Sequence, residues 1–149
     1  MEQHVSLFLP HFCSNKTILG VFNGCFYIDP TSKKPTYSNY YPGSINVTSA
    51  GSISGSTNID AYIYDDPYML FEAQCDGTLA KTDIGKNTDT VLTAGSTVNG
   101  LSKNEIDDST EATTAGLQVK IIGITKDPEN DDASSANANW YVMFNEHVK

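Results

Sequence analysis

The hydrophobic residues of this chain fall in short runs, separated by segments rich in Gly, Pro, Asn, Asp and Ser. Residues 59–66 show the clearest pattern, with Ile59, Ala61 and Ile63 alternating with polar or tyrosine positions. Successive side chains of a strand point to opposite faces, so this alternation predicts a half-buried strand. No segment longer than about two turns has the 3.6-residue period of a helix.

The remaining apolar runs extend this prediction to the whole chain. Asn23-Gly24 lies between two of them and predicts a β-hairpin with a type I′ turn. Ser102 and Glu105 have the spacing of a weak capping box, which predicts one helical turn. Further strands are predicted at residues 36–41, 44–48, 68–77, 117–125 and 139–148. The pattern predicts an all-β fold, an antiparallel sandwich or small barrel of jelly-roll-like form, with an N-terminal arm and long loops.

Two parts of the chain are expected, residues 1–16 and a single β domain over residues 17–149. The first part lacks a clean period and contains Pro10, so it is either an edge strand of the domain or an arm. We expect an arm that docks onto another chain, because a solvated tail would not carry this many large apolar residues, which are Val5, Leu7, Phe8, Leu9 and Phe12. The Ser/Gly-rich residues 49–58 predict a mobile loop. The core is expected to contain Phe71, Ile121, Ile122, Ile124, Trp140, Val142 and Phe144, with one of the two adjacent isoleucines facing elsewhere.

Composition excludes several classes of function. The 149 residues carry a net charge of -9, and all nine basic residues are lysines. Nucleic-acid binding is not expected, since such proteins rely on clustered positive charge and on arginine. No apolar run approaches the ~18 residues of a membrane span. Three cysteines without a Cys-x-x-Cys motif predict reduced, partly buried thiols, with no zinc site and no cofactor.

The acidic motifs favour turns over catalysis. Asp65 and Asp66 are adjacent and precede Pro67, which is typical of a turn, and neighbouring strand residues point to opposite faces. Residues 127–132 alternate oxygen ligands, but a calcium loop requires Gly where Asp132 stands and Glu where Ala138 stands. The chain also lacks the sequence motifs of catalytic triads and phosphate loops. The sequence therefore predicts no enzyme and no bound metal.

Tyrosines form the last candidate site. Tyr37, Tyr40 and Tyr41 cluster in a proline-containing segment, and Tyr is enriched at protein interfaces. We expect these three residues to contribute to an interface. A carbohydrate-binding platform and ordinary half-buried sheet residues are the alternatives.

Six phrases of the sequence, taken together and in this order, carry a resemblance to a known group of proteins. They are GCFYIDPTSKKPTYSNYYPGS, YDDPYMLFEAQCDG, DIGKN, STVNGLSKNEIDDST, LQVKIIGITKDPEN and NWYVMFNEHVK. Over roughly residues 20–148 the chain resembles small virion proteins of tailed marine phages, which are encoded near the major capsid protein and act as capsid decoration, or cement, proteins.

The resemblance implies a structural function without catalytic residues. It implies the major capsid protein as partner, a homo-oligomer (a trimer rather than a dimer), and a place on the capsid exterior of the virion after synthesis in the host cytoplasm. A glycan-binding head or tail appendage is the alternative function. It would differ from a cement protein in its copy number per particle.

Overall fold

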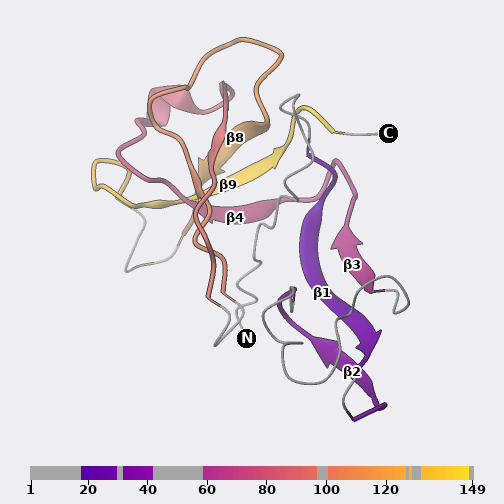
Figure 1. Cartoon of the computed structure of the whole chain (residues 1–149). Coiled ribbons are helices and arrows are strands. Elements are labelled where there is room, and N and C mark those ends of the chain that lie inside the picture. Colours follow the sequence, from indigo (N-terminus) through magenta and orange to yellow (C-terminus); the bar gives the residue numbers. More distant parts are fainter. Residues whose placement is uncertain are drawn as a thin grey trace.

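The computed structural model describes residues 18–29, 32–41, 59–96, 101–126, 128 and 132–147. Within these ranges the regular secondary structure is β-strand, apart from one short 3-10 turn, η2 (Lys81–Asp83) (Figure 1). The strands are β1 (Val21–Ile28), β2 (Pro35–Ser38), β3 (Asp60–Tyr64), β4 (Phe71–Gln74), β5 (Asn87–Thr88), β6 (Thr90–Val91), β7 (Glu105–Ile106), β8 (Val119–Ile124) and β9 (Asn139–Phe144). The prediction of an all-β fold is confirmed.

The strands form three antiparallel sheets. Their orders are β4-β9-β8-β5, β2-β1-β3 and β6-β7. Figure 1 shows the three-stranded sheet extending away from the four-stranded sheet, with only the beginning of β1 close to it. The arrangement is consistent with an open sandwich, and the described strands do not close into a barrel.

The main core lies on one face of the four-stranded sheet. Trp140, Val142 and Phe144 alternate along β9 and are buried, as the period of a half-buried strand requires. Phe71 of β4 packs on Phe144 with ring centroids 4.8 Å apart. The core also contains Ile18, Val21, Cys75, Leu79, Ile106, Val119, Ile121, Ala133 and Ala138.

The adjacent isoleucines of β8 point in different directions, as predicted. Ile121 is fully buried, whereas Ile122 is 36% exposed. Ile124 is partly buried against the core. The other predicted core residues, Phe71, Trp140, Val142 and Phe144, are all buried.

The predicted hairpin turn at Asn23-Gly24 is wrong, because β1 runs through it as one strand. The pairing of β1 with β3 shifts register between Phe22 and Gly24, so the dipeptide forms a bulge instead. Gly24 does adopt a positive φ of 132°, as the dipeptide suggests. A bulge also uses a glycine with φ > 0, and the pairing with β3 before and after the dipeptide keeps β1 extended here.

The actual connection between β1 and β2 is made by residues 29–34. The N–H of Asp29 donates to the carbonyl of Lys34 at 2.9 Å, and the N–H of Lys33 donates to the carbonyl of Asp29 at 2.8 Å. Lys33 has a φ of 58°, a left-handed conformation that is uncommon for a non-glycine residue. The strand predicted at residues 36–41 is shorter, since β2 ends at Ser38.

The predicted helical turn at Ser102 and Glu105 is also wrong. Glu105 belongs to β7, and the Ser102 hydroxyl oxygen accepts the N–H of Asn104 at 3.1 Å. Ile106 is fully buried and bridges to Cys75. Burial of this side chain, which a lone helical turn would not provide, outweighs the weak capping signal.

Several predictions concern residues outside the described ranges. These are the arm at residues 1–16 with its interface residues, the strand at residues 44–48 and the mobile loop at residues 49–58. Most of the acidic loop at residues 127–132 lies outside them as well. Among the helices of the described ranges, none is long and apolar enough to cross a membrane.

Candidate functional site

The predicted tyrosine cluster is divided by the fold. Tyr37 is 56% exposed and its ring lies 6.2 Å from that of Tyr62, measured between centroids. Tyr40 is half-buried, and its carbonyl accepts the thiol of Cys25 at 3.4 Å. Tyr41 is exposed. The sequence did not predict the pairing of Tyr37 with Tyr62, because only the placement of β2 and β3 on either side of β1 brings the two rings together.

The pair of acidic residues before Pro67 forms a turn, as predicted. The N–H of Tyr68 donates to Asp66 Oδ1 at 2.9 Å, and the N–H of Met69 donates to the carbonyl of Asp66 at 3.2 Å. A side-chain oxygen of Asp that accepts the N–H two residues on forms an Asx turn, which is common where Asp precedes proline. The predicted strand starts later than expected, since β4 begins at Phe71 and residues 68–70 remain exposed.

The two described cysteines are buried, without a disulfide. Burial raises the pKa of the Cys25 thiol above its usual range. The pKa of Cys75 is raised to about 11, chiefly by burial, with a smaller contribution from nearby carboxylates such as Asp108. Because the thiolate is the reactive form, a raised pKa lowers the reactivity of both thiols near neutral pH. Their expected role as small core residues agrees with this environment.

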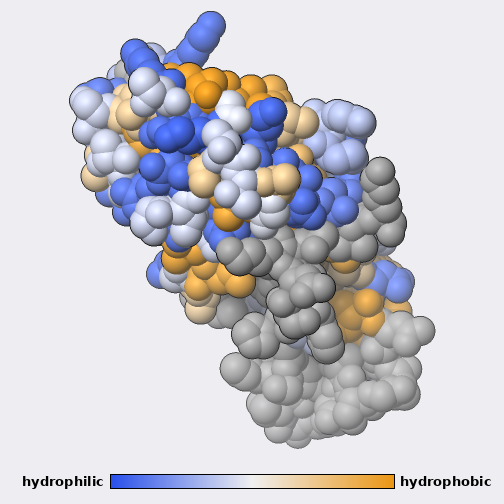
Figure 2. Space-filling view, turned by 90° about the horizontal axis from the view of Figure 1, so that it is seen from above, coloured by the Kyte–Doolittle hydropathy of each residue, from blue (hydrophilic) through white to orange (hydrophobic). Residues whose placement is uncertain are grey.

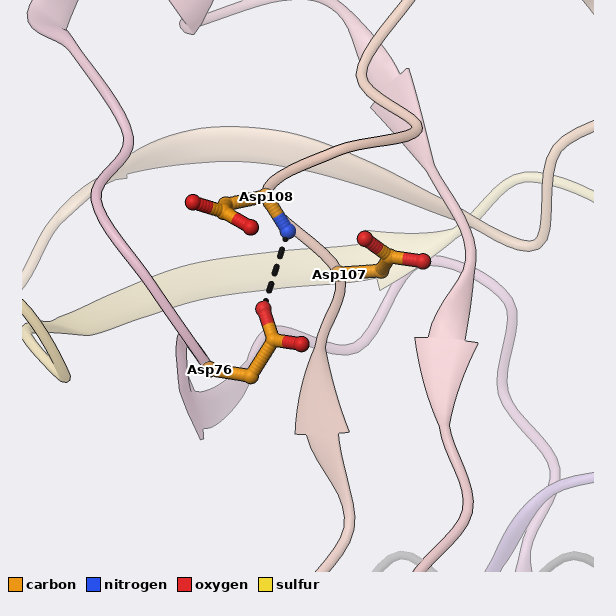
Figure 3. A group of neighbouring side chains, drawn as sticks. All are labelled: Asp76, Asp107 and Asp108. Carbon is orange, nitrogen blue, oxygen red and sulfur yellow. Dashed lines mark hydrogen bonds between the residues drawn. The ribbon is translucent and has the colours of Figure 1, made fainter.

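Three carboxylates meet at the end of the β4–β7 contact. Asp76 follows β4, while Asp107 and Asp108 follow β7, and each offers an oxygen within 4.8 Å of the others (Figure 3). The bridge between Cys75 and Ile106 holds the two segments together. No local motif joins these residues in the sequence, so only the strand contact reveals the group.

Each of these carboxylates accepts hydrogen bonds from nearby loop residues. Asp76 Oδ1 accepts the N–H of Asp108 at 3.0 Å, and Asp108 Oδ2 accepts the N–H of Thr78 at 3.0 Å. Asp107 Oδ1 accepts the N–H and the hydroxyl of Ser109 at 2.8 and 2.6 Å. Oxygen ligands of this kind suit Ca²⁺ or Mg²⁺, but the bonds to the loops explain the arrangement without an ion. The group is therefore best explained by hydrogen bonds that hold together the two loops after β4 and β7.

The last residue of η2, Asp83, is a buried carboxylate. Asp83 is 8% exposed, and its Oδ1 accepts a bond from Lys86 Nζ at 2.7 Å. Its Oδ2 accepts the N–H of Ala80 at 2.8 Å. The Lys86 ammonium group, with the Ala80 N–H, lowers the pKa of Asp83 below its ordinary value.

We expect Asp83→Asn to lower the free energy of unfolding near neutral pH. Because the folded pKa is lowered, the stabilisation is present above the unfolded pKa of about 4 and is lost as pH falls through the folded pKa. The difference between wild type and variant should therefore shrink in acid. Urea unfolding near neutral pH and at about pH 3 measures it. The exposed Asp60 supplies a control as Asp60→Asn, and an equal loss for both variants at both pH values would contradict the expectation.

Comparison of the chain with protein-family models, with curated proteins and with solved structures finds no match.

Proposed function

We propose that this chain is a virion structural protein, a capsid decoration protein that stabilises the head lattice of a tailed phage. The observation that supports this most is where the phrases that carry the resemblance lie in the fold. They contain β4, β8 and β9, the strands that build the main core, together with the turn at Asp66. The resemblance therefore rests on residues with a structural role, as a structural protein requires.

The surface supports a binding role. Figure 2 shows hydrophobic residues in several separate groups on the face seen from above, between larger hydrophilic areas. The large exposed apolar residues include Leu19, Ile28, Tyr37, Tyr41, Tyr62, Tyr68, Leu70, Ile84 and Leu101. Exposed aromatic and aliphatic side chains that lie in groups are typical of contact surfaces.

A decoration protein acts through linked equilibria. A ligand that binds the assembled lattice but not free subunits stabilises the lattice by mass action. Many identical weak contacts add through multivalency, particularly where the ligand is an oligomer. The net charge of -9 keeps unbound copies soluble and favours a basic partner surface.

The test compares phage particles with and without the gene for this chain. We expect purified wild-type particles to contain it at a copy number near that of the capsid subunit. Particles lacking it should release their DNA at a lower temperature, and adding back the purified protein should restore resistance. Absence from purified particles, or equal heat resistance with and without the protein, would contradict the proposal.

One observation favours a second candidate, the glycan-binding appendage. The exposed rings of Tyr37 and Tyr62, 6.2 Å apart, could stack on a sugar, with Asp60 on the same face of β3 as Tyr62. An appendage would be present in only a few copies per particle. Loss of glycan binding in a Tyr62→Ala variant would support this second function.

A further inference from the structure

We propose that the exposed residues Tyr68, Met69 and Leu70, here called the apolar turn, dock into an apolar socket rimmed by Lys or Arg on the assembled capsid. This inference rests on the proposed function and names the contact through which it would operate. The three side chains are 82%, 36% and 53% exposed. They are consecutive in the loop between β3 and β4, so three large apolar side chains are exposed within one short segment.

The apolar turn is held firmly at its start. Two hydrogen bonds to Asp66 close the backbone there, and Pro67, which precedes Tyr68, has a restricted φ. The loop is anchored at both ends, since Tyr64 at the end of β3 packs against the core and Phe71 at the start of β4 belongs to it. A loop fixed in this way loses little conformational freedom on binding, so most of the free energy of burial is retained.

A close backbone contact fixes the loop from the side. A Cβ atom at Gly20 would lie 2.6 Å from the carbonyl oxygen of Tyr64 and 3.4 Å from Cα of Asp65. The segment before β1 therefore lies directly against the start of the loop. Figure 1 shows this loop between β3 and β4, beside the beginning of β1.

The chemistry of the loop identifies the partner. Asp65 and Asp66 are exposed and flank the apolar side chains with two negative charges. A matching surface is apolar at its centre and basic at its rim. A second copy of this chain is a poor match, because its net charge is -9 and its basic residues are nine lysines against eighteen acidic residues. The complementary surface is therefore expected on another protein.

The experiment measures binding of the full-length protein to capsids produced by a phage from which its gene has been deleted. The double variant Tyr68→Ser with Leu70→Ser removes most of the exposed apolar side-chain surface of the turn. Asp65→Lys reverses one negative charge without breaking the two hydrogen bonds that close the turn, because both are made to Asp66. Leu92→Ser is the matched control, because Leu92 is also 55% exposed but lies after β6. Thermal unfolding verifies that each variant folds.

We expect the double variant to bind about ten-fold more weakly or worse, as loss of central contacts typically does. Asp65→Lys should bind more slowly and with a weaker dependence on salt, and Leu92→Ser should bind like the wild type. Unchanged binding of the double variant, with normal binding of the wild type, overturns this inference and leaves the proposed function intact. Failure of the wild type to bind overturns both. A wild-type oligomer that the double variant dissociates would instead make the occupant a second copy.

Discussion

Replacing Trp140 by alanine should lower the free energy of unfolding by about 3–5 kcal/mol. Trp140 is fully buried in β9 and lies opposite Ala73 of β4 and Ile124 of β8. Truncation would leave a large cavity between three strands that cannot easily collapse. Domains of this size are stable by about 5–15 kcal/mol, so a substantial part of the total would be lost. Urea unfolding followed by circular dichroism measures it, since the variant removes the chain's single tryptophan.

Two further variants serve as controls for the loss of packing at Trp140. Trp140 Nε1 has no hydrogen-bond partner among the described residues, so Trp140→Phe breaks no such bond and should cost less than half as much. Ile122→Ala, on the exposed side of β8, should cost little. An Ala variant at position 140 that unfolds like the wild type would show that the core is not organised around this ring.

Gly24→Ala should destabilise the protein by roughly 1–3 kcal/mol from backbone strain alone, with an additional steric cost. The residue has a φ of 132°. An added Cβ would lie 2.1 Å from the Tyr37 hydroxyl oxygen and 2.9 Å from the carbonyl oxygen of Ser38. It would therefore displace Tyr37, whose hydroxyl donates to the Asn23 carbonyl at 2.5 Å.

Other glycines of the chain act as matched controls. Gly85 has a φ of 91° but open space around its Cα, so Gly85→Ala measures strain without a clash. Gly123 lies in β8 with open space and without a positive φ, so Gly123→Ala should be neutral or slightly stabilising. We expect the losses in stability to rank Gly24 above Gly85 above Gly123. Equal stability of the Gly24 and Gly123 variants would contradict the bulge described for β1.

The local hydrophobic pattern was sufficient to predict the buried residues of a strand that faces the core on one side. The turn at Asp66 was predicted from its Asp-Asp-Pro sequence, and strands β3 and β8 were predicted from alternation. For β3 the alternation gives the wrong buried face, because Ala61 and Ile63 are exposed and Tyr64 packs against the core instead. In β8 and β9 the core residues were predicted correctly. In these segments the local preference and the tertiary contacts agree, which makes the sequence informative.

Tertiary contacts decided the remaining features. Asn23-Gly24 suits both a turn and a bulge, and the pairing of β1 with β3 before and after the dipeptide selects the bulge. Glu105 and Ile106 become strand because β6 and Cys75 lie beside them.

The candidate sites depend on such long-range pairing even more strongly. The composition, charge and alternation of the chain determined an acidic, all-β protein without help from the structure. The pair Tyr37 and Tyr62, and the group formed by Asp76 with Asp107 and Asp108, each join segments distant in the sequence. Because hydrophobic period reports only which side of one strand is buried, it does not specify which strands become neighbours, and that choice is made by packing of the whole domain.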